Sequence, residues 1–426
     1  MTDVSNDKAH WGTAKAAGNI ARRKRSEWIL KGLGIGAISI AFLMLFLLVS
    51  SLVSTGWQAF TQTHIRMSFS VPAEKVRQDN IAGANWRGIV QDAMEAALPG
   101  IDPDDARKMA GILSNAAQFS LRDKVVADPS LIGKTVEMTV PASDPYDQLY
   151  KGLIDRETPE ANRRLKDPEI AAFDMLLADG RVSKPLNAAL ITNADSRFPE
   201  LAGLKGALMG SFYALMTCFL LSFPIGIGAA IYLEEFAPKN KMSDFIEINI
   251  NNLAAVPSVV FGLLGLAVFL NWFGLPRSAP FVGGLVLALM TLPTIIIATR
   301  AALKAVPPSI REAALGLGAS RQQVVFHHVL PLAMPGILTG TIIGLAQALG
   351  ETAPLLLIGM NAFITAAPGS PFDSSTALPT QIFIWADSPE RGFVSRTSAA
   401  ILVLLGFLVT MNALAIYLRS RFERKW

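Results

Sequence analysis

The sequence has one cysteine, Cys218, in 426 residues, so no disulfide can form within the chain. It has four histidines, two of them adjacent, and they do not follow the ligand spacing of a metal site. Only 17% of the residues are charged, against about 25% in soluble domains, whereas 51% are hydrophobic. The composition predicts a membrane protein with a soluble portion, and it gives no reason to expect a metal or a cofactor.

Six apolar segments are long enough to cross a bilayer, which takes about 20 residues because the hydrocarbon core is about 30 Å thick. The first run, from Trp28 to Val53, is too long for the apolar part of a signal peptide, and no clear cleavage site follows it. We therefore interpret it as a retained span. The predicted transmembrane helices cover residues 29–54, 205–233, 248–272, 280–303, 331–358 and 397–418.

Basic clusters beside apolar runs mark the cytoplasmic side of a membrane. One cluster, Arg22 to Arg25, precedes the first run, and another, Arg419 to Lys425, follows the last. Both tails, residues 1–28 and 421–426, are therefore predicted to be cytoplasmic. Nucleic-acid binding is the alternative role for such clusters, but their position beside apolar runs argues against it. We expect a multi-pass protein of the cell inner (plasma) membrane, in contact with the lipid bilayer.

The segment between the first two spans, residues 60–198, is rich in charged and turn-forming residues. Within it, residues 86–98 and 104–118 have the spacing of amphipathic helices, and residues 136–140 alternate like a strand. This pattern predicts a small α+β extracytoplasmic domain inserted into an otherwise all-α polytopic protein. Long domains are translocated regardless of charge, so its basic residues do not contradict the predicted topology.

A short polar segment, about residues 308–328, lies between the fourth and fifth predicted spans. Pro307 and Pro308 stop the fourth span. Two capping-box patterns follow, in which a hydroxyl and a carboxylate or amide satisfy free backbone amides at a helix start. Two glycines between them allow the first helix to end. The predicted order is helix, glycine turn, helix, with these signals at Ser309, Glu312, Gly316, Gly318, Ser320 and Gln323.

This polar segment resembles the EAA loop of ABC-importer permeases. The resemblance is carried by Glu312-Ala313-Ala314, Gly318 and Leu330-Pro331, and it departs from the usual pattern only at His328. It implies the type I ABC-importer permease fold with six transmembrane helices over residues 205–420 and the first span. It also implies that the segment is a coupling helix, docked on a separate ATPase subunit. The chain has no complete Walker motif, so we expect no enzyme activity of its own.

Three further patterns resemble the phosphate-importer permeases of the PstA type: Gly350-Glu-Thr-Ala-Pro354, Val256-Pro-Ser-Val-Val-Phe-Gly262, and Leu292-Pro293 with Lys304-Ala-Val-Pro307. The resemblance covers about residues 200–426, and residues 60–198 look like an extension found in a subset of the family. It implies phosphate import by alternating access. The implied partners are a PstC-like permease, forming a heterodimer, a dimer of ATPase subunits and a periplasmic phosphate-binding protein.

Two other functions stay open. One is an ABC permease for another oxyanion or small solute. The other, of a different class, is a membrane sensor or scaffold that uses residues 60–198 to bind a ligand.

Glu351 is the clearest charge inside the predicted spans, where such groups usually face a cavity or a partner. We hypothesise that it lines or gates the pathway by pairing with a basic residue of a partner subunit; a structural ion pair is the alternative.

Arg300 is either a gate residue or an interfacial anchor. Helix lengths argue against a direct Arg300–Glu351 pair within one chain. The arginine and glutamate of many such permeases are here Ile297 and Arg300, so that charge pair does not carry over.

A transported anion needs hydrogen-bond donors, and the chain supplies few fixed cations inside its spans. Hydroxyl and amide side chains are the candidates, although such residues also hold helices together. Pro257 and Pro293 are expected to break their helices and free backbone groups toward a cavity. The candidate donors are Ser258, Thr291, Thr294, Asn251, Asn252 and Gln347.

Overall fold

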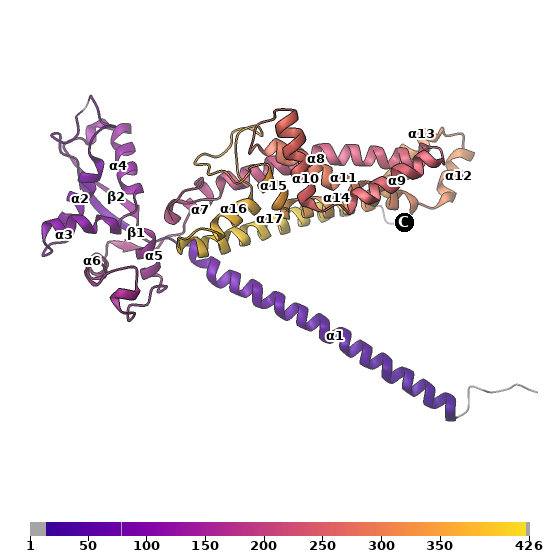
Figure 1. Cartoon of the computed structure of the whole chain (residues 1–426), viewed down its shortest axis with the longest axis horizontal. Helices are drawn as coiled ribbons and strands as arrows, with labels where there is room; N and C mark the ends of the chain where they lie inside the picture. Colours follow the sequence, from indigo (N-terminus) through magenta and orange to yellow (C-terminus); the bar gives the residue numbers. More distant parts are fainter. Residues whose placement is uncertain (1–13, 78, 423–426) are drawn as a thin grey trace, which may run out of the picture. The chain divides into compact units, whose positions relative to one another are not determined.

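The computed structural model describes residues 14–77 and 79–422 (Figure 1). The outer parts of both predicted tails, with Arg424 and Lys425, lie outside the described residues. The chain divides into two units, Met1–Ser54 and Thr55–Trp426. The described part of the first unit is helix α1 (Ala14–Gly56), which continues into the start of the second. It contains the predicted span 29–54, and its polar residues before Trp28 extend the same helix because no proline interrupts them.

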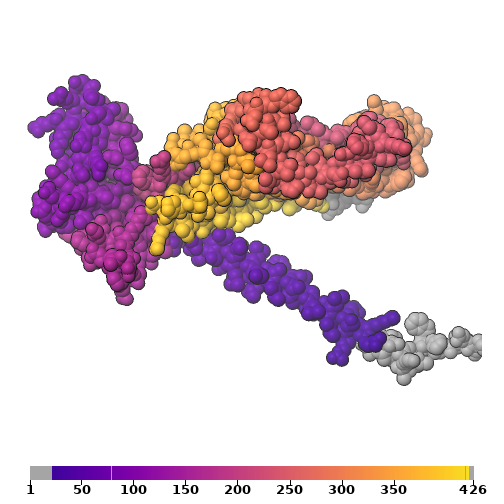
Figure 2. Space-filling model, viewed as in Figure 1, coloured from indigo at the N-terminus to yellow at the C-terminus, as the bar shows by residue number. Residues whose placement is uncertain are grey.

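The second unit begins with an α+β region, which gathers into one body in the space-filling view (Figure 2, violet to magenta). Strand β1 (His64–Ser70) pairs antiparallel with β2 (Thr135–Pro141) and with β3 (Val182–Ser183), in the order β2-β1-β3. One hydrophobic core, running from Ile65 to Leu176, lies between the sheet and its helices. The helices are α2 (Trp86–Ala97), α3 (Pro103–Lys108), α4 (Ala116–Ala127), α5 (Asp144–Tyr150), α6 (Asp167–Ala178) and α7 (Ala189–Thr192), and the short 3-10 turns are η2 (Trp57–Phe60), η3 (Met109–Ile112), η4 (Pro129–Leu131), η5 (Glu160–Asn162) and η6 (Pro199–Leu201).

The sequence predicted this region in part. The helix expected at 86–98 is confirmed as α2, and the strand expected at 136–140 is confirmed within β2. The single helix expected at 104–118 is wrong, because α3 and η3 end before an extended Leu113 and α4 begins at Ala116. The break forms because Leu113 and the next residue pair with the end of β2 instead of continuing a helix.

The remainder of the second unit is a bundle in which α8, α11, α14 and α17 run alongside one another (Figure 1). Three of its helices continue into π-helical turns. The elements are α8 (Lys205–Ile231), η7 (Tyr232–Phe236), α9 (Lys241–Ala254), α10 (Ser258–Leu264), η8 (Gly265–Trp272), α11 (Pro280–Lys304), α12 (Pro308–Gly316), α13 (Arg321–Gln323), η9 (Val324–Val329), α14 (Leu330–Gly350), α15 (Ala353–Leu357), α16 (Leu378–Ala386) and α17 (Gly392–Phe422).

Five helices among the described residues are long and apolar enough to cross a membrane, and a bent pair adds a sixth if it counts as one span. That pair replaces the predicted straight span 248–272: α9 and α10 meet at an angle of 103°. Pro257 explains the break, because a proline has no amide hydrogen to donate to the preceding turn. The matching expectation for Pro293 is wrong, since α11 runs through this proline without ending.

The predicted fifth span, 331–358, is also wrong at its end. Helix α14 stops at Gly350, Glu351 is extended with φ −74° and ψ 118°, and α15 begins at Ala353. A proline ring clashes with the carbonyl four residues before it, so Pro354 prevents the helix from passing through Gly350. Glu351 therefore lies at a helix break and not on a continuous span. Helix α16 was not predicted, because its 9 residues are too few for the span criterion.

Close backbone contacts at glycines hold the bundle together. A Cβ placed at Gly340 on α14 would overlap Ala298 on α11, and one at Gly336 would lie 2.7 Å from Ala302 one turn away. Small residues at such spacing let helices approach closely, which provides packing where no hydrophobic effect drives helices together in lipid. Gly340 therefore packs against a helix and does not line a path.

Replacing Gly340 with alanine should lower the thermal unfolding midpoint of the purified protein. The added methyl forces α11 and α14 apart, and overpacking of this kind costs about 1–3 kcal/mol. The matched control is Gly344→Ala on the same helix, where an added Cβ would meet its neighbours at 3.8 Å or more, an ordinary contact. Equal midpoints for the two variants would contradict the packing assignment.

Candidate functional site

The first candidate site is the end of the bundle that carries α12 and α13, referred to below as the α12 end (Figure 1). Ala314 is buried, whereas Glu312 and Ala313 are exposed, and Leu317 is 91% exposed. Gly318 follows with φ +87°, the left-handed conformation that ends helices and that other residues rarely adopt. The predicted order of helix, glycine turn and helix is confirmed by α12, Gly318 and α13.

The two predicted capping boxes had different outcomes. The second is confirmed: Ser320 Oγ accepts from Gln323 N at 3.3 Å, and Gln323 Oε1 accepts from Ser320 N at 2.8 Å. The first, between Ser309 and Glu312, is wrong. Helix α12 begins two residues earlier than predicted, at Pro308, with Pro307 in place of Ser309 as its N-cap and no side-chain cap among the described residues. Ser309 is thus inside the helix, and the exposed Glu312 is not needed to cap it.

Arg311 fixes α12 to two other elements. Its Nη1 donates to Val306 O at 2.7 Å, and its Nη2 donates to Leu303 O at 2.9 Å, both at the end of α11. Nη2 also pairs with Glu235 Oε1 at 2.8 Å, on η7. The guanidinium thus adds a donor to two carbonyls at the end of α11 and joins α12 to both α11 and α8.

Arg300 forms a second ion-pair group one step further into the bundle. Its Nε lies 3.2 Å from Glu234 Oε2, and its Nη2 lies 2.8 Å from Glu247 Oε2 on α9. Lys304 adds a longer contact of 3.6 Å to Glu234. The Arg300 and Glu234 side chains are only 14% and 18% exposed, so this group is partly shielded from water. Glu351 is not among the partners of Arg300, as the helix lengths predicted.

The ion pairs of Arg311, Arg300 and Lys304 together are called the ion-pair cluster below. Sequence reasoning missed its three acidic members, Glu234, Glu235 and Glu247. A signal was present, because Glu234 and Glu235 end an apolar run of more than 25 residues and charges are costly there unless paired. The sequence could not say which arginines would meet them, since Arg300 and Arg311 lie 66 and 76 residues further along the chain.

Replacing Arg311 with glutamine should loosen α12 without unfolding the bundle. The shorter neutral side chain cannot reach both Glu235 and the α11 carbonyls, and hydrogen bonds to charged groups contribute about 1.5–3 kcal/mol. Amide hydrogen exchange of residues 308–317 should become faster. Arg321→Gln, at an exposed position of α13, is the control that should leave exchange unchanged. Identical exchange in both variants would show that Arg311 does not hold α12.

The second candidate site is where the two broken helices meet. A Cβ at Gly262 on α10 would lie 2.7 Å from the Cα of Pro354, so α10 and α15 are in close contact. Ser258 begins α10, and Glu351 lies just before α15; both are partly exposed. Two of the sequence patterns that resembled phosphate-importer permeases are therefore brought together, although they lie almost 100 residues apart.

The other predicted donors are more dispersed. Thr291 is buried, with its Oγ1 3.4 Å from Cys218 Sγ, and it serves the contact between α8 and α11. Thr294 faces Gly344 with its methyl 3.8 Å from a Cβ placed there. Three of the predicted donors have exposed side chains: Asn251, Asn252 and Gln347.

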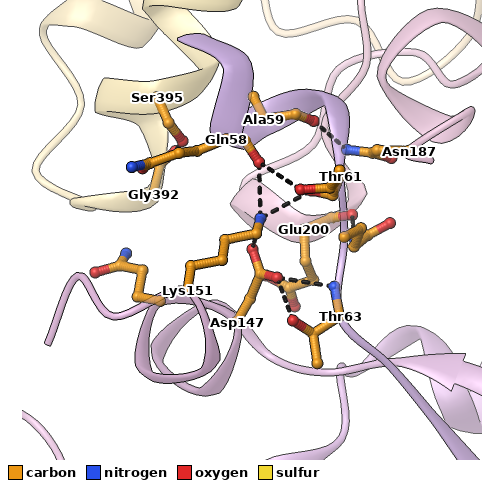
Figure 3. A network of polar contacts seen from close by, with 12 residues as sticks. Gln58, Ala59, Thr61, Thr63, Asp147, Lys151, Asn187, Glu200, Gly392 and Ser395 are labelled. Carbon is orange, nitrogen blue, oxygen red and sulfur yellow. Dashed lines mark hydrogen bonds and ion pairs between the residues drawn. The ribbon is translucent and has the colours of Figure 1, made fainter. Parts of the chain in front are cut away.

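A third polar group lies where the α+β region joins the helices (Figure 3). Lys151 Nζ donates to Gln58 O and Thr61 O, both at 2.8 Å, and pairs with Asp147 Oδ2 at 2.6 Å. Asp147 Oδ1 also accepts from Thr63 N at 2.8 Å. The Lys151 side chain is only 7% exposed, and burial lowers its pKa despite the adjacent Asp147. All three ammonium hydrogens have acceptors, which makes this lysine structural.

Two carboxyl groups nearby, Glu200 and Asp144, are buried. Glu200 accepts a hydrogen bond from Ser114 Oγ at 2.8 Å, and Asp144 accepts one from Gln148 Nε2 at 2.8 Å. Burial raises the pKa of both groups above their ordinary values. It outweighs these hydrogen bonds, the guanidinium of Arg164 with its Nη1 3.6 Å from Asp144 Oδ2, and the charge of Arg396 near both groups.

This burial predicts a pH dependence of stability. A carboxyl whose pKa is raised on folding binds its proton more tightly in the folded state, so the free energy of unfolding falls as pH rises through the window above the unfolded value of about 4.3. Glu200→Gln removes the buried charge, keeps an acceptor for Ser114, and should flatten this slope in thermal unfolding measured across that window. Glu137→Gln, at an exposed strand position, should keep the wild-type slope. A wild-type slope in Glu200→Gln would contradict the assignment.

Comparisons with known proteins cover most of the chain. Residues 222–425 match the family model "Binding-protein-dependent transport system inner membrane component". Residues 17–160 match a domain of unknown function, DUF3333.

Curated relatives of several organisms align with part of this chain. Probable ABC transporter permease protein YqgI of Bacillus subtilis is 36% identical over 44% of this chain, which spans 63% of YqgI, less than two thirds of its length. Phosphate transport system permease protein PstA 1 of Mycobacterium tuberculosis is 32% identical over 51% of this chain and 70% of its own length. Phosphate transport system permease protein PstC of Pasteurella multocida is 34% identical over 52% and 75%. Among solved structures, a chain of the MetNI methionine ABC transporter aligns with 52% of this chain and 98% of its own, at 16% identity and a TM-score of 0.42.

Proposed function

Because the chain belongs to the family of binding-protein-dependent transport system inner membrane components, we propose that it is a permease subunit of an ATP-driven phosphate importer. It forms half of a transmembrane pathway that opens alternately to the two sides of the membrane, and it catalyses no reaction itself. A dimer of separate ATPase subunits hydrolyses ATP. A PstC-like permease supplies the second half of the pathway, and a periplasmic phosphate-binding protein delivers the cargo. The relatives named as phosphate transport permeases support this cargo.

The observation that carries the proposal is the α12 end, which is exposed and yet firmly held. Glu312, Ala313 and Leu317 present a polar and apolar surface to solvent, as a docking element requires. Arg311 connects this surface to α11 and α8 through three hydrogen bonds. A force applied to α12 by an ATPase subunit is therefore passed to the spans and is not absorbed by a loose loop.

The ion-pair cluster connects α12 mechanically to the transmembrane helices. Arg311 pairs with Glu235, and Arg300 joins the neighbouring Glu234 on η7 to Glu247 on α9. Helices α8, α9 and α11 thus move with α12. Alternating access needs such discrete coupled elements, because packed helices shift between arrangements and do not deform continuously.

The positions of basic residues support a cytoplasmic location for α12. Lys239, Lys241 and Lys304 lie at the same end of the bundle as α12, as the positive-inside rule requires of a cytoplasmic face. The α+β region is then extracytoplasmic, and both termini are cytoplasmic if the bent pair α9–α10 counts as one span.

The pathway in this proposal runs past the α10–α15 contact. Broken helices expose backbone groups only where they line a cavity, and such breaks mark binding sites in other transporters. Glu351 and Ser258 lie at the two breaks, with exposed Asn252 on α9 and exposed Gln347 on α14 as further candidates. Thr294 is a weaker candidate because its side chain packs against α14. Arg300 acts in coupling and not as a ligand of the anion.

The test of the function is the ATPase activity of the complete complex in lipid vesicles. Phosphate with its binding protein should stimulate hydrolysis, and sulfate or molybdate should not. Stimulation by one of these anions in place of phosphate would overturn the cargo and favour a permease for another oxyanion. An absence of ATPase subunits from the purified complex would overturn the permease role and favour the sensor.

Leu317→Asp should prevent the ATPase subunit from co-purifying with the chain. The side chain is 91% exposed, so the change leaves the fold intact but puts a charge into the apolar part of the proposed docking surface. Leu186→Asp is the matched control, since Leu186 is 77% exposed and lies in the α+β region. Normal ATPase recovery with Leu317→Asp would remove this residue from the docking surface.

A further inference from the structure

The α+β region shares a hydrophobic core with the bundle. Ala59, before β1, and Leu190 and Ala202, between β3 and α8, are buried in one cluster with side chains of three bundle helices. Both chain segments that enter and leave the region are therefore packed and are not free linkers. The bundle side of this cluster, from α8, α16 and α17, includes Ala207, Leu378, Trp385, Phe393, Ala399 and Ala400.

Directed hydrogen bonds fix the same two segments. Asn187 Nδ2 donates to Ala59 O at 2.9 Å, which ties the outgoing segment to the incoming one. Trp385 Nε1 on α16 donates to Asp195 Oδ1 at 3.0 Å, and both residues are buried. The Lys151 network adds a third tie by holding α5 to the segment before β1 (Figure 3).

The first turn of α17 meets the region at three further points. The buried Arg396 Nη1 donates to Ala202 O at 2.6 Å. Gly392 lies so close to the Asp144 carboxylate that a Cβ at this position would overlap it. Arg164 Nη2 pairs with Glu390 Oε2 at 2.9 Å, two residues before α17. A rotation of the region relative to α17 would break all three contacts.

We propose that the α+β region is a rigid extension of α16 and α17, and that it moves with them as one body through the transport cycle. The proposal rests on the proposed function, in which the spans change arrangement while ATP is hydrolysed. A partner that binds the region on the extracytoplasmic side then acts directly on α17. The alternative is a tethered module that swings on its connecting segments.

The proposal also changes what removal of residues 62–198 would do. Compact relatives that lack such a region suggest that transport could continue without it. In this chain the deletion would take away Asp144, Asp147 and Lys151 and leave Arg396 facing Glu200 alone. The remaining ends would also lose Asn187, Leu190 and Asp195 from the shared contacts.

A reversible cross-link tests the rigid connection. Cysteines in place of Arg164 and Glu390, whose side chains are 47% and 41% exposed, would be bridged by a short bis-methanethiosulfonate reagent in the complete complex. Bridged protein should keep the ATP-driven uptake of the same variant treated with methyl methanethiosulfonate. Loss of uptake on bridging, restored by a reductant, would overturn the proposal because it would show that the region must move relative to α17. The native Cys218 is buried and should not react.

A distance measurement tests the rigid extension independently of the proposed cargo. Spin labels at Glu157 in the region and Val394 on α17, both exposed, should keep the same distance distribution with and without trapped ATP. The control pair joins Glu157 to an exposed site on the second permease subunit, and its distance should change as the two halves of the pathway rearrange. If no tested anion is transported but the first distance stays constant while the second changes, the cargo is wrong and the rigid extension stands. A shift in the first distance overturns the rigid extension whatever the cargo.

Discussion

The bundle depends on backbones that approach one another at small residues. Gly336 and Gly340 of α14 meet Ala302 and Ala298 of α11, and Gly284 of α11 meets α8 so closely that a Cβ there would overlap Thr217. Lipid gives helices no hydrophobic reason to associate, so contact area at short range has to supply the attraction. This packing makes α8, α11 and α14 one block. In the proposed function, the charged groups at the α12 end transmit movement because they act on this block.

At the two helix breaks the backbone leaves the regular helix, and its polar groups need partners other than those of the helix. Backbone groups freed at Pro257 and before Pro354 would be costly against lipid, and they are tolerated where other protein or water covers them. Helix α10 packs on α15 where Gly262 meets Pro354, next to the second break, whereas Pro257 at the first break is exposed on this chain. The site proposed to line the pathway is also one where the backbone leaves the regular helix.

The apolar runs of the sequence located the long helices well, because length and hydropathy report directly on a span. The capping box at Ser320 was predictable from residues three apart, but the same spacing at Ser309 predicted a box that does not form. The breaks were harder, because Pro257 and Pro354 lie at helix breaks whereas α11 runs through Pro293. The ion-pair cluster was out of reach, because Glu234 and Arg300 meet only after α8 and α11 have packed. The single helix predicted at 104–118 was wrong for a similar reason, because Leu113 pairs with a residue 29 positions away.

The π-helical turn η7 decides how the end of α8 presents its charges. A π-turn holds more residues than an α-turn, so neighbouring side chains point in directions that differ by a smaller angle. Glu234 and Glu235 are consecutive, and yet one meets Arg300 and the other Arg311. On a regular α-turn the two carboxylates would diverge further around the helix. The one extra residue in the turn thus sets the directions of the two side chains, so that a single helix end can pair with two arginines from different elements.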